Sequence, residues 1–264
     1  MRGSELAYDD LGNGPAIVLL HGFPFDRSMW REQIDFLDGT GYRVIAPDLR
    51  GLGTNKASED FTTMDQMARD VVALMDERKI DRGVVCGLSM GAYVGFELVS
   101  LFPSRVHALV LAGARAQGPD DAEKKSREEK ARLVLAEGMT GLADEMLPQL
   151  LAAKTLAEKP DVVARVREMI GNTNPRGAAA AQRGMAARRD YSDGLHEINA
   201  PTLIIAGRDD AIRTPKDAEL IHNGIRNSRL ETVDDAGHLT NIEQPDVFNR
   251  ALLGFLTSNL ILKT

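Results

Sequence analysis

One pentapeptide constrains the fold of this chain more than any other feature. Gly87-Leu88-Ser89-Met90-Gly91 joins an apolar run typical of a β-strand (83–86) to a run with helical character (92–99). Glycines on both sides let the strand and helix pass close together and hold the serine in a strained turn beside the helix N-terminus. The motif therefore predicts a nucleophile elbow at the rim of a sheet. A glycine-rich turn that happens to contain serine is the plain alternative.

Alternating strands and helices on both sides of the elbow predict a mostly parallel sheet. Strand-like apolar runs cover 16–20, 42–48, 83–86, 105–113, 201–207 and 228–233, with helix-like runs between several of them. This order is typical of right-handed βαβ units, and continuous apolar runs are typical of strands buried on both faces. We expect an α/β fold, a twisted, mostly parallel sheet with helices on both faces. The alternating segment 4–8 predicts an edge hairpin that leads into the strand at 16–20.

The strand–helix rhythm stops between residues 114 and 197. This segment is rich in charge and alanine and contains no strand-like run. Four helices are expected within it, at 123–137, 142–151, 161–170 and 175–187. Because the segment leaves and re-enters the same sheet, we expect a helical cap, or lid, inserted into a core formed by 1–113 and 198–264.

Composition excludes several classes of protein. The chain has 264 residues and a net charge of −7, which argues against nucleic acid as a partner. Its single cysteine, Cys86, excludes an internal disulfide, and no cysteine–histidine cluster suggests structural zinc. No apolar stretch reaches the roughly 18 residues of a membrane span, and polar sequence follows Met1–Ser4 where a signal peptide would be apolar. We expect a cytoplasmic monomer or homodimer that acts on a small molecule.

Three residues that follow predicted strands form a candidate catalytic triad. Ser89, Asp210 and His238 each come just after a strand, and the carboxyl ends of parallel strands lie at one rim of a sheet. A serine hydroxyl becomes a good nucleophile when a neutral imidazole accepts its proton, and a carboxylate orients that imidazole. The chain order serine, acid, histidine also fits a nucleophile elbow.

The acid and the base each have competitors in the sequence. Asp209 precedes Asp210, and the strand-end pattern Gly207-x-x-Asp210 favours the second aspartate, with Asp209 as a solvated or loop-capping neighbour. The remaining histidines fit the role of base less well because they begin a strand, lie on a helix, lie near the end of the insertion or precede the serine; they are His107, His222, His196 and His21.

Ester chemistry also needs two backbone N–H groups that stabilise the oxyanion, each worth roughly 3–4 kcal/mol. Met90, directly after the candidate nucleophile, supplies one. Phe23 is the best candidate for the second, because it lies in the loop after the 16–20 strand and the following Pro24 has no N–H. His21 is suited to shaping this loop.

The chain resembles the α/β-hydrolase superfamily over essentially its whole length. Five blocks carry the resemblance: His21-Gly22-Phe23-Pro24, Asp48-x-Arg50-Gly51-x-Gly53, Gly87-Leu88-Ser89-Met90-Gly91, Gly207-x-x-Asp210, and Gly237-His238 with Asn241, Glu243 and Pro245. The resemblance implies the catalytic triad Ser89–Asp210–His238, an oxyanion hole from Phe23 and Met90, and no metal or organic cofactor.

The stretch 174–201 is similar to small bacterial carboxylesterases and 3-oxoadipate enol-lactonases, and perhydrolase-like esterases share the triad. We therefore expect a serine hydrolase that cleaves carboxylic esters or lactones through an acyl-enzyme at Ser89. The alternatives are a lactonase for 3-oxoadipate enol-lactone or an N-acyl homoserine lactone, a C–C hydrolase or lyase, and a slowly hydrolysing ligand receptor.

Arginines in and near the insertion have two interpretations. They select an acidic substrate, or they are solvated charges on exposed helices, which is the commoner role. The residues concerned are Arg115, Arg176, Arg183, Arg188, Arg189 and Arg213.

Overall fold

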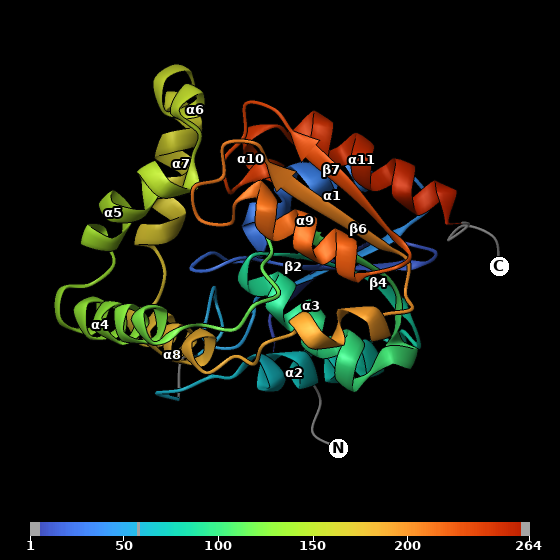
Figure 1. Cartoon of the computed structure of the whole chain (residues 1–264), viewed down its shortest axis with the longest axis horizontal. Coiled ribbons are helices and arrows are strands. Elements are labelled where there is room, and N and C mark those ends of the chain that lie inside the picture. The colour runs from blue at the N-terminus through green and yellow to red at the C-terminus, as the bar shows by residue number, and fades with distance from the viewer. Residues whose placement is uncertain (1–5, 57–58, 260–264) are drawn as a thin grey trace.

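The computed structural model describes residues 6–56 and 59–259 and contains a seven-stranded sheet in the order β1-β3-β2-β4-β5-β6-β7 (Figure 1). All neighbouring strands pair in parallel except β1 with β3. The α/β class and the parallel sheet are therefore confirmed. The strands are β1 Tyr8–Gly12, β2 Ala16–Leu20, β3 Arg43–Pro47, β4 Gly83–Leu88, β5 Val106–Ala112, β6 Thr202–Gly207 and β7 Ser228–Val233.

The first strand differs from the sequence prediction. β1 does not form a hairpin with β2; it pairs antiparallel with β3, with Tyr8 opposite Pro47. Asp10 on β1 accepts hydrogen bonds from Arg43 at 2.8 and 2.7 Å and from Arg78 at 2.9 Å, and these bonds hold its pKa below the usual value. The prediction was wrong because the short link to β2 suggested a local hairpin, whereas Arg43 joins β1 to β3 and Arg78 joins it to the end of α2.

Helices cover both faces of the sheet (Figure 1). α1 (Arg31–Leu37) and α11 (Pro245–Ser258) pack together, and next to them the rings of Trp30 and Phe248 lie 5.9 Å apart. α2 (Met64–Glu77) and α3 (Met90–Leu101) pack on the other face, while α9 (Pro215–Gly224) packs against β6 and β7. Among the residues described, no helix has the length and apolar character needed to cross a membrane.

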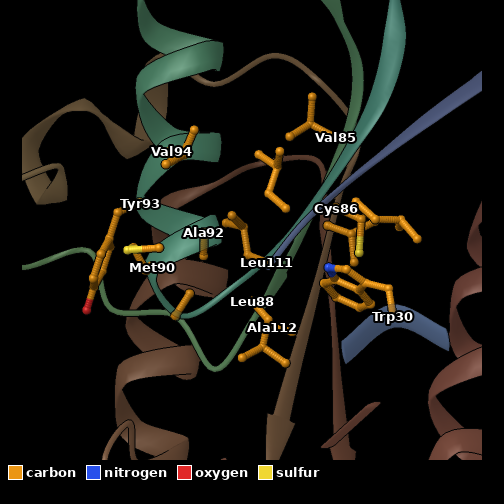
Figure 2. Packing of buried hydrophobic residues seen from close by; sticks show 14 of the residues in the cluster. Trp30, Val85, Cys86, Leu88, Met90, Ala92, Tyr93, Val94, Leu111 and Ala112 are labelled. Carbon is orange, nitrogen blue, oxygen red and sulfur yellow. The ribbon is translucent and has the colours of Figure 1, made fainter. Parts of the chain in front are cut away.

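The elbow lies between two deeply buried elements of the core. Every residue of β4 is buried, and so are ten of the twelve residues of α3. Figure 2 shows Met90, Tyr93 and Val94 of α3 on one side of β4 and Trp30 on the other. Burying a large apolar side chain contributes about 1.5–3 kcal/mol, so this packing fixes the strand and the helix on either side of Ser89.

Along the chain, five helices connect β5 to β6, and they lie to one side of the sheet (Figure 1). They are α4 Asp121–Glu137, α5 Thr140–Leu150, α6 Ala153–Glu158, α7 Pro160–Gly171 and α8 Pro175–Ala186. We call residues 114–197 the helical insertion. Four of these helices match predicted segments, and a 3₁₀ turn follows at Ser192–Glu197. α6 was missed because it is short and no side chain caps its first turn. α8 lies close to the core, where Thr62 N–H donates to Ala180 O at 3.2 Å.

Candidate active site

Ser89 occupies the turn between β4 and α3 in a backbone conformation that residues other than glycine rarely adopt, with φ 55° and ψ −109°. Its N–H donates to Ala112 O at 2.8 Å, which anchors the turn to β5. A Cβ on Gly91 would lie 2.1 Å from Leu20 O, so a larger residue cannot stand there. The glycine spacing thus lets strand and helix approach, and the surrounding packing maintains the strain at Ser89.

Asp210, three residues after the end of β6, lies against His238. Its Oδ2 is 2.7 Å from His238 Nδ1, and its Oδ1 accepts the backbone N–H groups of Ile212 and Arg213, both at 2.8 Å. Burial raises the pKa of this carboxyl, but the charge and hydrogen bond of His238 and the two N–H groups outweigh burial and lower it. The neighbouring Asp209 is exposed. The structure therefore places Asp210, and not Asp209, beside the histidine.

His238 is buried in the loop that follows β7. With Nδ1–H donating to Asp210, its Nε2 is left as the acceptor nitrogen. Its backbone N–H donates to Leu150 O at 2.8 Å, at the end of α5. Next to the ring, Gly113 has φ +51°, and a Cβ there would lie 2.9 Å from His238 Cε1. The imidazole therefore fits only because residue 113 is a glycine, and its carboxylate partner holds it there.

The loop after β2 lies next to the elbow. A Cβ on Gly22 would be 3.6 Å from Ser89 Cβ, and Phe23 and Ser89 line the same cavity. His21 is fully buried, Leu49 N–H donates to its Nε2 at 2.8 Å, and its Nδ1 lies 2.9 Å from Gly22 O. Burial lowers the pKa of His21, which favours a neutral ring with Nδ1–H as the donor. His21 thus ties the candidate oxyanion loop to Leu49, as its position in the sequence suggested.

A cavity of about 480 Å³ lies beside the elbow, the loop after β2 and the loop of His238. Phe23, Ser89 and His238 line it from the core, and Met146, Leu150 and Met185 supply apolar surface from the insertion. The nucleophile and base of the predicted triad therefore face one space of small-molecule size, and Asp210 supports the base from behind.

The structure separates the arginines that the sequence grouped together. Arg115 and Arg213 line the cavity. Three others pair with carboxylates outside the cavity lining: Arg176 with Asp60, Arg183 with Glu128 and Arg189 with Glu97. Arg188 is buried and pairs with Glu123 at 2.9 Å. Arg127 also lines the cavity, and no pattern in the sequence distinguishes it from the other charged residues of α4.

Glu243 has a structural role that sequence reasoning missed. Its side chain is buried, Oε2 accepts from Ala152 N–H at 2.8 Å, and Oε1 accepts from Gly237 N–H at 2.9 Å. Burial raises the pKa of this carboxyl although the backbone donors oppose the shift. One side chain therefore joins the insertion to the residue before His238. The fixed spacing Gly237-His238-x4-Glu243 was the available signal.

Other candidate chemistry is sparse in the described residues. The thiol of Cys86 is buried, and burial raises its pKa well above the ordinary value. Across 6–56 and 59–259, no group of three or more His, Cys, Asp or Glu residues is placed to hold a metal ion.

Comparisons with known proteins agree with this architecture. Residues 15–245 match the family model described as the alpha/beta hydrolase fold. The chain is 29% identical to 3-oxoadipate enol-lactonase 2 of Acinetobacter baylyi over 90% of its own length and 87% of that protein's. A thermophilic esterase from Thermogutta terrifontis, solved with malate bound, superposes with a TM-score of 0.94 at 37% identity, covering 96% of this chain and 93% of the esterase.

The enol-lactonase from Burkholderia xenovorans superposes with a TM-score of 0.89 at 33% identity, covering 96% of each chain. The chain belongs to the α/β-hydrolase fold family, and it is a hydrolase.

Proposed function

We propose that this hydrolase cleaves carboxylic esters or lactones through an acyl-enzyme at Ser89. The observation that carries the proposal is the hydrogen bond of 2.7 Å between Asp210 and His238, combined with a cavity that both His238 and the strained Ser89 line. Similarity to an esterase and to enol-lactonases supports the choice of substrate class.

In the proposed reaction, His238 Nε2 accepts the proton of the Ser89 hydroxyl as its oxygen attacks the substrate carbonyl. Asp210 keeps the imidazole in the required tautomer and stabilises the imidazolium that forms. The backbone N–H groups of Phe23 and Met90 stabilise the oxyanion. His238 then returns the proton to the leaving alcohol, and a water molecule that His238 activates hydrolyses the acyl-enzyme.

In this proposal the helical insertion forms the wall of the substrate cavity that faces Ser89 and His238, and it acts as a lid. In a lactone the leaving alcohol stays attached to the acyl group, so the same steps open the ring and give a hydroxy acid. No step requires a metal or an organic cofactor. Esters and lactones are therefore alternative substrates of one mechanism.

Steady-state turnover tests the proposal directly. Wild type and Ser89→Ala would be compared on p-nitrophenyl esters from acetate to decanoate, on γ- and δ-lactones and on one N-acyl homoserine lactone. We expect wild type to turn over at least one class, and Ser89→Ala to lose on the order of 10⁴-fold or more in kcat while unfolding like wild type. Activity that survives Ser89→Ala would refute the acyl-enzyme, and absence of turnover on the whole panel would refute the substrate class.

A further inference from the structure

Positive charge exceeds negative charge in one wall of the cavity. Among the described residues, four guanidinium groups share the carboxylate of Glu123: Arg127 at 2.8 Å, Arg188 at 2.9 Å, Arg213 at 3.5 Å and Arg115 at 3.6 Å. All four side chains are less than one-third exposed. Water therefore screens these charges less than it does on an open surface.

Glu123 has little capacity left for a fourth cation. Its Oε1 accepts from Arg127 and Arg188, and its Oε2 accepts a second bond from Arg188 at 3.2 Å. Burial raises the pKa of Glu123, but the hydrogen bonds and charges of Arg188 and Arg127 lower it to about 2. The carboxylate is thus ionised and already paired.

Arg115 is the member of this group with the weakest pairing. Its contacts to Glu123 and Asp217 are both 3.6 Å long, which is beyond hydrogen-bond distance. Its Nε is buried and has no hydrogen-bond partner in the described part of the chain. A buried N–H group without an acceptor is unfavourable unless a ligand supplies the acceptor.

The position of Arg115 connects it to the chemistry. It follows β5 by three residues, two positions after Gly113, which faces the ring of His238. It lines the same cavity as Ser89, and Lys130, another cation of that cavity, is paired with Glu145 at 2.8 Å. Arg115 is therefore the cation best placed to meet a bound anion.

We propose that this cavity selects esters and lactones that carry a second, free carboxylate, and that Arg115 binds that carboxylate. Guanidinium presents paired N–H donors that match the two oxygens of a carboxylate, and Arg213 and Arg127 add positive charge along the same wall. The inference rests on the proposed function, because the carboxylate is recognised while Ser89 attacks the ester carbonyl elsewhere in the substrate.

Matched substrate pairs test this selectivity. One pair is mono-p-nitrophenyl glutarate and p-nitrophenyl pentanoate, and a second is γ-butyrolactone with and without a carboxyl group on its γ-carbon. In at least one pair we expect kcat/KM of wild type to be about tenfold or more higher for the anionic member. Arg115→Gln should lower kcat/KM for that member by about 10- to 100-fold and change the neutral member by less than about threefold.

Two controls accompany the variant. Arg176→Gln removes an arginine that is 60% exposed and paired with Asp60 outside the cavity lining, and it should leave both ratios unchanged. Activity on the neutral substrate reports that Arg115→Gln is folded.

Equal turnover of both members of both pairs, or an equal loss on both in Arg115→Gln, would overturn the inference and leave the hydrolase intact. The absence of Ser89-dependent turnover on all four substrates would overturn the proposed function together with this inference.

Discussion

At the scale of single residues, His238 is held in place before any substrate binds. Asp210 fixes one ring nitrogen, Gly113 leaves room for the ring, and the backbone N–H bonds to Leu150. Asp210 is in turn held by two backbone N–H groups on the same loop. Preorganisation of this kind lets charge develop on the imidazole without rearrangement of the protein.

Substitution of each adjacent aspartate distinguishes their roles. Asp210→Asn should lower kcat by on the order of 10⁴-fold, because an amide stabilises neither the required histidine tautomer nor the imidazolium. Asp209→Asn should change kcat by less than about threefold, because its side chain is exposed and Asp210 is the carboxylate bonded to the ring. Steady-state kinetics on one ester compare the two variants, and the reverse order of effects would show that the acid is misassigned.

At the scale of elements, the helical insertion and the histidine loop are parts of one hydrogen-bonded unit. The side chain of Glu243, in α10 (Thr240–Glu243), accepts hydrogen bonds from backbone N–H groups of both segments. In addition, Lys159 Nζ donates to Glu243 O at 2.6 Å. The position of the insertion is therefore coupled to the position of His238. Such coupling means that a change in α5 or α6 can alter catalysis without touching the substrate.

Glu243→Gln tests this coupling. An amide has one acceptor oxygen, so one of the two buried N–H groups loses its partner and stability should fall by about 1–3 kcal/mol. We expect kcat to fall about 10- to 100-fold at temperatures where the variant is fully folded, with KM changed far less, because His238 shifts. Denaturant unfolding and steady-state kinetics measure the two effects. Unchanged kcat in the folded variant would show that Glu243 has only a structural role.

How far the sequence predicts these elements depends on the range of the interactions involved. The elbow, the strands and the rim positions of Ser89, Asp210 and His238 follow from local patterns and from the geometry of parallel sheets. The role of Glu243 does not, because its partner Ala152 lies 91 positions away and contributes only a backbone N–H. The pairing of β1 with β3 was not predicted for the same reason, since Arg43 and Arg78 are distant in sequence from their partner Asp10.

At the scale of the whole molecule, the insertion is also joined to the core through Glu123. This residue of α4 pairs with Arg213, which lies on the loop of Asp210 in the core. Glu123 thus attaches the insertion near Asp210, and Glu243 attaches it near His238. We infer that the wall of the cavity and the candidate triad keep one relative geometry at neutral pH.

Acid should weaken the ion pairs that Glu123 forms with Arg127 and Arg188. The pKa of Glu123 falls from 4.5 to about 2 in the fold, so its ionised form stabilises the native state above pH 4.5 and this contribution is lost as the pH falls toward 2. The shift corresponds to about 3 kcal/mol. Glu123→Gln should therefore be less stable than wild type at pH 7, and the difference should shrink between pH 5 and pH 3. Denaturant unfolding at several pH values measures it, and a constant difference would contradict the assignment.

The central claim is that Ser89 is the activated nucleophile of this hydrolase, and covalent labelling tests it most directly. Diethyl p-nitrophenyl phosphate transfers its phosphoryl group to an activated serine: the Ser89 oxygen bonds to phosphorus, p-nitrophenolate leaves, and His238 takes the serine proton. Mass spectrometry of the intact and digested protein should find one diethylphosphoryl group, located on Ser89, with none on Ser89→Ala and slow labelling of His238→Ala. A wild-type protein that hydrolyses esters while Ser89 stays unlabelled, or that is labelled elsewhere, would contradict the account.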